Sequence, residues 1–261
     1  MKVLFLPLPQ EFASARLRGT IPQRELKKFG VMPGNDIIIL AKHGWPDFVA
    51  KGFGKVVFDV CDDHFHTSNE EHYRKWCLKA DLITCNSLEM QDIIKRETGR
   101  DAEIIHDPYE QPLRPPRCSR PPLWFGHGSN FGDILPLIPQ VPDLMLVSNY
   151  PHPKVIQWSP EVMDRAYERA GIVLIPTGHK RAKSANRAVD AIRRGMYPCT
   201  GRIPCYDELG LGSDDVLAEM EARLADPYWT CKRIADLQEL VEFRFAPATI
   251  GKEWLRVLGS I

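Results

Sequence analysis

The sequence predicts an α/β protein made of two halves of similar design, followed by a helical C-terminus. Short, uninterrupted apolar runs alternate with amphipathic helical patterns through the first 107 residues. A segment with six prolines between Pro108 and Pro122 interrupts this alternation, which then resumes. Strands that are apolar throughout are typical of parallel sheets covered by helices on both faces. We therefore expect two Rossmann-like domains.

The first half is expected to contain five strands and three helices. The helix in "SLEMQDIIKRETG" has Ser87 as its N-cap and ends at Gly99, which are the residue types preferred at those positions. The predicted strands cover 2–8, 35–42, 55–60, 81–87 and 102–108, and the predicted helices cover 22–30, 69–80 and 87–99.

The second half repeats this pattern after the proline-rich segment, which cannot be a helix or a central strand. We place an N-terminal domain at 1–107, a linker at 108–121 and a C-terminal domain at 122–261, whose last helix is a candidate for packing back on the first domain. Strands are predicted at 123–128, 143–149, 154–158, 171–176 and 196–201, and helices at 130–138, 160–170, 182–195 and in two or three segments of 214–261.

Composition narrows the class of protein. Lys plus Arg and Asp plus Glu number 34 each, so the whole chain is not a generic nucleic-acid binder, although a local basic patch is allowed. The seven cysteines form no CxxC pair, which favours a reducing compartment. The N-terminal apolar run stops at Pro7, too early for a signal peptide, and no run is long enough to span a membrane. A cytoplasmic protein is expected.

Ligands of open parallel sheets bind at the carboxyl ends of the strands, so the loops that follow strands are the candidate sites. The loop "GHGSN" follows one predicted strand and precedes a helix. Its glycines permit close approach of the backbone, and the helix N-terminus favours an anion. This pattern predicts a phosphate site at Gly128, Ser129 and Asn130, with an ordinary strand-to-helix turn as the alternative. It matches neither a dinucleotide fingerprint nor an ATPase P-loop.

A second candidate anion site is the basic segment "GHKRAKSANRAVDAIRRG". Lys180 precedes a predicted helix, and Lys183 lies in its first turn. Lys183, Arg187, Asp190 and Arg194 share one face of that helix. Cations at a helix N-terminus are unfavourable alone, so an anionic partner would relieve them. The alternative is an exposed polar face with internal Arg–Asp pairs.

The order of several motifs resembles the GT-B superfamily of glycosyltransferases. The second half carries "GIVLIP", then a helix with Asp190 five residues before Gly195, then "GMYPCTG". The stretches "SARLRG", "ADLITCNSLEMQDI", "LWFGHGSN" and "FRFAPATIGKEWLRVL" are similar to other landmarks of that superfamily. The resemblance is diffuse but covers nearly the whole chain.

The resemblance implies a GT-B architecture and transfer of a sugar from a nucleoside-diphosphate sugar, such as a UDP-sugar, without a metal or a cofactor. Asp190 would hold the ribose, because a carboxylate accepts hydrogen bonds from two neighbouring hydroxyls. Ala182 stands where many retaining relatives carry an acid. The donor-binding residues are expected to be Gly128, Ser129, Asn130, Lys180, Lys183, Asn186, Arg187 and Asp190.

In the first half, "DVCDDHFH" follows a predicted strand. Asp62 and His64 are the candidate catalytic residues, because either could act as a base on an acceptor hydroxyl. A divalent metal site and simple capping of a turn are the alternatives. Arg16 and Arg18 are expected to contact the acceptor or the donor phosphates, with an exposed flexible loop as the alternative.

The acceptor is expected to be a carbohydrate or a lipid. A second possibility is a hydroxymethylated base in DNA, as for the compact phage enzymes of this superfamily, which would require base flipping. Another is a degenerate, non-catalytic protein that retains the nucleotide-sugar pocket, and an epimerase or a phosphorylase of the same fold is a further possibility.

Overall fold

A computed structural model describes residues 1–6, 13–41, 51–178 and 182–261. The chain divides into two compact units. Unit 1 comprises Met1–Glu110, Ala182–Ser184 and Phe243–Ile261, and unit 2 comprises Gln111–Arg181 and Ala185–Glu242. Unit 1 thus contains a short segment from the middle of the chain and a C-terminal segment in addition to the N-terminal half.

Unit 1 is built on a parallel sheet in which neighbouring strands follow the order of the chain, β1-β2-β3-β4-β5. The strands are β1 (Lys2–Phe5), β2 (Met32–Ala41), β3 (Lys55–Val60), β4 (Leu82–Cys85) and β5 (Glu103–Ile104). The helices are α1 (Ala13–Ala15), a π-helical turn (Arg16–Thr20), α2 (Ile21–Lys28), α3 (Glu70–Lys79), α4 (Leu88–Thr98) and α11 (Pro247–Leu258).

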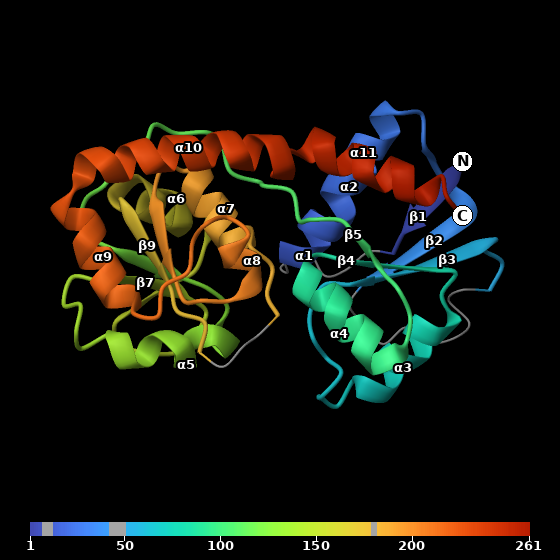
Figure 1. Ribbon diagram of the computed structural model, residues 1–261, viewed down its shortest axis with the longest axis horizontal. Helices are drawn as coiled ribbons and strands as arrows, with labels where there is room; N and C mark the ends of the chain where they lie inside the picture. Colours follow the sequence, from blue (N-terminus) through green and yellow to red (C-terminus); the bar gives the residue numbers. More distant parts are fainter. Residues whose placement is uncertain (7–12, 42–50, 179–181) are drawn as a thin grey trace. The chain divides into compact units, whose positions relative to one another are not determined.

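Both faces of this sheet are buried. Alternate residues of a strand point to opposite faces, so Ile38 and Leu40 pack with α3 and α4, whereas Ile37 and Ile39 pack with α2 and α11 (Figure 1). The uninterrupted apolar run of β2 follows from this double coverage. The C-terminal helix α11 contributes a large share of the second layer through Ile250, Trp254, Val257 and Leu258.

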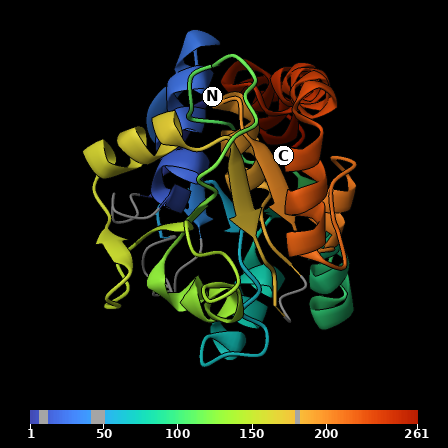
Figure 2. The ribbon, with the colours of Figure 1, turned by 90° about the vertical axis from the view of Figure 1, so that its left-hand side faces the viewer.

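Unit 2 contains a second parallel sheet with the order β10-β9-β6-β7-β8. Its strands are β6 (Leu123–Phe125), β7 (Met145–Ser148), β8 (Val155–Gln157), β9 (Ile172–Ile175) and β10 (Tyr197–Thr200). The helices are α5 (Phe131–Ile134), α6 (Pro160–Arg169), α7 (Asn186–Arg193), α8 (Pro204–Asp207), α9 (Val216–Ala225) and α10 (Pro227–Phe245), with 3-10 turns at Gly128–Asn130 and Leu135–Leu137. In Figure 2, which faces this unit, α6 and α9 lie on either side of the strands.

The α/β class, the two parallel sheets and the helical C-terminus are confirmed. Two helix predictions need correction. The helix expected at 130–138 is divided into α5 and a 3-10 turn that contains Pro136, because proline cannot donate the hydrogen bond that would continue it. The helix expected at 182–195 begins only at Asn186, because Ala182–Ser184 packs with unit 1.

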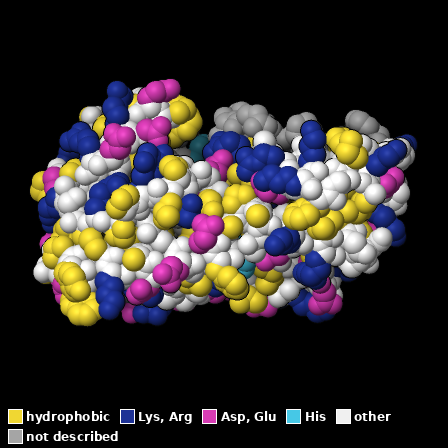
Figure 3. Space-filling model, turned by 90° about the horizontal axis from the view of Figure 1, so that it is seen from above, with side chains coloured by type: hydrophobic (Ala, Val, Ile, Leu, Met, Phe, Trp, Pro, Cys, Tyr) yellow, Lys and Arg dark blue, Asp and Glu magenta, His cyan; other side chains and the backbone are white. Residues whose placement is uncertain are grey.

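Charges of both signs are mixed over the surface seen in Figure 3, where Lys and Arg side chains are interspersed with Asp and Glu. Among the described residues no helix combines the length and the hydropathy needed to cross a bilayer. All seven cysteines are free, and five of them are buried.

Replacement of Glu253 by glutamine is expected to stabilise the protein at neutral pH. Glu253 lies on α11, and its Oε2 is buried without a hydrogen-bond partner among the described residues. Burial raises the pKa of this carboxyl although Arg256, Arg18 and Arg244 oppose the rise. A carboxyl whose pKa is higher in the folded state than in the unfolded state holds its proton more tightly when the protein is folded. Its contribution to stability is therefore fully present below the unfolded-state pKa and is lost as the pH rises through the folded-state pKa.

The gain from Glu253→Gln should therefore be present at pH 7 and shrink toward pH 4, as measured by urea unfolding at both values. Glu239→Gln, on the exposed face of α10, is the matched control and should change stability little at either pH. An equal gain for Glu253→Gln at both values would contradict a burial penalty on the charged form.

Candidate functional site

The strand order of unit 2 reverses between β6 and β9, which are neighbours although β7 and β8 separate them in the chain. A crevice at the carboxyl ends of such a strand pair is where open α/β sheets bind ligands. The loops after β6 and β9 meet there, since a Cβ on Gly178 would lie 2.6 Å from Oδ1 of Asp133. Gly178 also has a φ of +54°, which favours glycine. In unit 1 the described strands follow chain order without reversal.

The loop after β6 differs from the predicted phosphate cradle. The Gly128 N–H donates to Asn149 Oδ1 at 2.7 Å, the Ser129 N–H to His127 Nδ1 at 3.3 Å, and the Asn130 N–H to the His127 carbonyl at 2.9 Å. All three amides therefore have partners inside unit 2. A phosphate bound here would have to displace one of these hydrogen bonds. The contacts are those of an ordinary strand-to-helix turn, the alternative interpretation of this loop.

Arg187 provides the clearest positive charge at the switch point. It lies in the first turn of α7, and its Nη1 donates to the carbonyl of Phe125, the last residue of β6, at 3.3 Å. Among the described residues no carboxylate lies within ion-pair distance of its guanidinium. A half-buried cation that no described carboxylate pairs with, at the end of β6, is suited to binding an anion.

The Arg187 charge also acts on the buried phenol of Tyr206, which follows β10. Burial raises the pKa of Tyr206 to about 12, although the neighbouring Arg187 opposes the rise. Tyr206 therefore stays neutral beside the guanidinium. A neutral Tyr206 does not offset the positive charge of Arg187. Tyr206 was not among the site residues predicted from the sequence.

The rest of the predicted donor set is only partly brought together. Asn186 and Asp190 lie on α7 with Arg187 and are half-buried. Lys183 precedes that helix in the segment that packs with unit 1, so it does not share a helix face with them. Lys180 lies outside the described residues.

Arg194, expected on the same exposed face, is instead buried. It binds Asp164 and Gln111 and stacks over Tyr167, with its Cζ 4.9 Å from the ring centroid. The expected polar stripe along α7 is therefore shortened to its first turns, where Arg187 and Asp190 lie.

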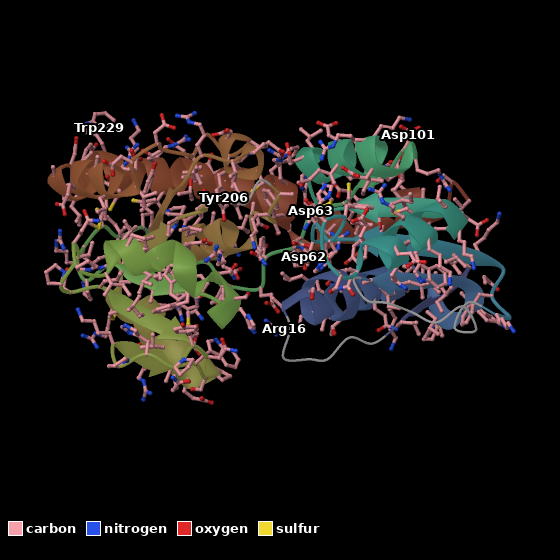
Figure 4. The ribbon with its side chains drawn as sticks, turned by 90° about the horizontal axis from the view of Figure 1, so that it is seen from below. Arg16, Asp62, Asp63, Asp101, Tyr206 and Trp229 are labelled. Atoms are coloured by element: carbon pink, nitrogen blue, oxygen red, sulfur yellow. The ribbon has the colours of Figure 1, made fainter. Side chains whose placement is uncertain are left out.

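In unit 1 the loop after β3 gathers the predicted catalytic residues around Tyr73. The His64 ring packs edge-on against Tyr73 with centroids 5.0 Å apart, and the Asp62 charge contributes to raising the pKa of the Tyr73 phenol, after burial as the main cause. The loop is shaped by capping, since Asp63 accepts the Phe65 N–H at 3.1 Å. Figure 4 shows Asp62 and Asp63 together, with Asp101 well separated from them. Among the described residues no group of three metal-ligating side chains is arranged to hold an ion.

Arg18 has a different role from the predicted one. It is 1% exposed, and its guanidinium donates to Asp59, to Asp107 and to the carbonyl of Ile105. Its donors are thus committed inside unit 1, where it supports the ends of β3 and β5. Arg16 is more exposed and forms an ion pair with Glu110 at 2.6 Å.

Asn86 is a further polar residue that the sequence analysis did not single out. It follows β4, and its Nδ2 donates to the carbonyl of Cys61 at 3.0 Å. Its Oδ1 is buried without a partner among the described residues, which makes it a candidate acceptor beside the β3 loop. The signal was its place directly after a strand, in "TCNS".

Solved structures match the chain over nearly its whole length at low sequence identity. HepE of Anabaena in complex with UDP-glucose is 13% identical with a TM-score of 0.68, over 99% of this chain and 85% of that one. The DNA-modifying enzyme β-glucosyltransferase is 10% identical with a TM-score of 0.58, over 99% of both chains. An E. coli trehalose-6-phosphate structure with UDP-2-fluoro-glucose is 9% identical with a TM-score of 0.62, over 98% and 80%.

The chain has the GT-B fold. All three of these solved structures are GT-B proteins, and the two parallel sheets of the chain correspond to theirs. No protein-family model and no curated protein sequence matches the chain. The agreement therefore lies in the arrangement of strands and helices and not in sequence motifs.

Proposed function

We propose that the protein is a glycosyltransferase that moves a sugar from a nucleoside-diphosphate sugar, such as a UDP-sugar, to a hydroxyl acceptor. The observation that carries the proposal is Arg187, a cation that has no ion-pair partner in the described part of the chain and lies at the strand switch point of a GT-B fold. Two of the matching structures contain UDP-glucose or a fluoro analogue of it, which supports a donor of this class.

In the proposed reaction the bond between the anomeric carbon and the diphosphate oxygen breaks, and a bond from that carbon to the acceptor oxygen forms. The diphosphate leaves with the bonding electrons, and Arg187 offsets its charge. The acceptor proton passes to a base, for which Asp62 and His64 of the β3 loop are the candidates. Asp190, one turn after Arg187, would accept hydrogen bonds from the ribose. No cofactor or metal is part of the proposal.

A nucleic-acid acceptor is the second candidate. The observation that favours it is the match to the DNA-modifying β-glucosyltransferase over 99% of both chains. A carbohydrate or lipid acceptor remains the first expectation. The cytoplasmic setting expected from the cysteine content also stays a prediction.

A thermal-shift screen of nucleotide sugars, followed by an assay for released nucleoside diphosphate, tests the proposal. We expect one donor to raise the melting temperature and to be consumed when an acceptor is present. A donor that raises the melting temperature but releases no nucleoside diphosphate with any acceptor would indicate a non-catalytic protein that only binds nucleotide sugars. If no donor raises the melting temperature, the proposal is refuted.

Replacement of Asp190 by alanine is expected to weaken donor binding by roughly tenfold or more, the effect of losing hydrogen bonds to a charged group. Asp164→Ala, an exposed carboxylate of α6 that pairs with Arg194, is the matched control and should leave donor affinity unchanged. Isothermal titration of both variants gives the comparison. An unchanged affinity in Asp190→Ala would mean that the ribose assignment is wrong.

A further inference from the structure

An aromatic surface borders the switch point of unit 2 on the β7 side. The loop after β6 and the segment that joins β7 to β8 are tied together by the hydrogen bond from Gly128 N–H to Asn149 Oδ1. Tyr150 stacks on the buried ring of Phe131, with centroids 4.3 Å apart and planes 12° apart, and remains 39% exposed. Trp158, at the end of the adjacent strand β8, is 50% exposed. We call this the stacking surface.

The two strand ends that carry these rings lie side by side. Ser148 of β7 pairs with Gln157 of β8, and the Trp158 N–H donates to the Ser148 carbonyl at 3.0 Å. Neighbouring strands are about 4.8 Å apart. Trp158 therefore lies beside Asn149 at the carboxyl edge of the sheet, and Tyr150 is the next residue along the chain.

Two histidines of this surface are held in the same tautomer. His127 Nδ1 accepts the Ser129 N–H at 3.3 Å, and His152 Nδ1 accepts the Lys154 N–H at 3.2 Å. A backbone N–H can only donate, so neither Nδ1 carries a proton and each ring keeps its proton on Nε2. Each histidine thus offers an N–H donor, and His152 lies against the Phe131 ring with centroids 5.2 Å apart.

The polar groups of the surface favour an anionic, planar ligand. The segments 126–132 and 148–158 contain Lys154 and two histidines but no Asp or Glu. Two of their three amide side chains are used internally, since Asn149 holds Gly128 and Gln157 Nε2 donates to the Tyr150 carbonyl at 3.4 Å. Apart from Asn130, and Asp133 at their border, these segments offer few groups to accept hydrogen bonds from sugar hydroxyls, whereas N–H donors, an ammonium and exposed rings are present.

We propose that the stacking surface binds a single-stranded segment of nucleic acid, with bases on Tyr150 and Trp158 and phosphates at Lys154, His127 and His152. Rings that stack bases, combined with cations that follow the backbone, are the usual means of binding single strands without sequence preference. The stacking surface adjoins the switch point within unit 2. Only the further step, in which the bound nucleic-acid strand is the acceptor, rests on the proposed transferase function.

Fluorescence anisotropy with a labelled oligothymidylate of about 12 nucleotides tests the inference. The unchanged protein should bind the strand, and Tyr150→Ala should weaken binding by about tenfold or more, since one stacked base contributes an effect of that size. Lys154→Gln should flatten the salt dependence of binding between about 50 and 200 mM. Tyr228→Ala, which removes a 73% exposed ring from α10 of the same unit, should bind like the unchanged protein.

Circular dichroism of each variant checks the fold, and Tyr150→Phe, which keeps the ring, should retain binding. The inference is wrong if the unchanged protein does not retain the strand at the lower salt concentration, or if folded Tyr150→Ala binds it as tightly as Tyr228→Ala. Donor binding by thermal shift is measured separately. Strand binding that fails while a nucleotide sugar still stabilises the protein overturns only this inference, and the reverse result overturns only the transferase proposal.

Discussion

Replacement of Arg18 by methionine is expected to lower the free energy of unfolding by about 3–5 kcal/mol, the usual cost of leaving buried charges without their partner. Arg18 is buried between Asp59, which is fully buried, and Asp107, which is 7% exposed. Burial alone would lower the pKa of the guanidinium, but the charge and hydrogen bonds of Asp59 outweigh it and hold that pKa above its usual range. The variant would keep two buried carboxylates and lose the cation between them.

Urea unfolding of Arg18→Met measures this loss against Arg256→Met. Arg256 pairs with Glu103 at 3.0 Å on the surface of the same unit, where both side chains are largely exposed, and should contribute no more than about 1 kcal/mol. Adding Asp59→Asn to Arg18→Met should restore part of the stability by removing one stranded charge. If Arg18→Met and Arg256→Met lower the free energy of unfolding equally, the buried ion pairs of Arg18 contribute no more to stability than a surface ion pair.

Replacement of Arg187 by alanine is expected to weaken binding of the nucleotide-sugar donor by roughly ten- to hundredfold, the equivalent of about 1.5–3 kcal/mol for hydrogen bonds to a charged group. The guanidinium donates to the Phe125 carbonyl and has no ion-pair partner among the described residues. A diphosphate would supply that partner. Titration calorimetry with the donor found in the thermal-shift screen gives the affinity.

Arg169→Ala, an exposed arginine in the last turn of α6, is the matched control and should leave the affinity unchanged. Arg187→Lys keeps the charge but loses the planar fork, so it should bind with intermediate affinity. Donor binding in Arg187→Ala equal to that of the unchanged protein would mean that the diphosphate lies elsewhere.

The sequence predicted the central strands well because they are buried on both faces and therefore largely apolar, whereas the short edge strand β8 is mostly exposed. The run "DIIILA" needs no knowledge of its neighbours to be read as a buried strand. The order of the strands in a sheet cannot be predicted in this way, because the local hydrophobic pattern does not show in which direction each crossover connection runs. The reversal between β6 and β9, which locates the candidate site, therefore required the structure.

The errors in the site arise from partners that are distant in the chain. Arg18 sits in a segment with no helical pattern, which suggested a free cation, yet its partners are 41 and 89 residues away. A phosphate site was predicted at Gly128 to Asn130, but the Gly128 amide donates to Asn149, 21 residues away. Arg187 and Asp190 were placed together correctly because one helix carries both.

The interleaving of segments in unit 1 has a consequence for the order of folding during synthesis. One layer of its core needs Ile250, Trp254, Val257 and Leu258, which follow all of unit 2 in the chain. Unit 2 is complete once residue 242 has emerged, whereas one face of the N-terminal sheet is covered only by α2 until α11 arrives. The half that is made first is therefore finished last, and its exposed apolar face is the part of the nascent chain most in need of protection from aggregation.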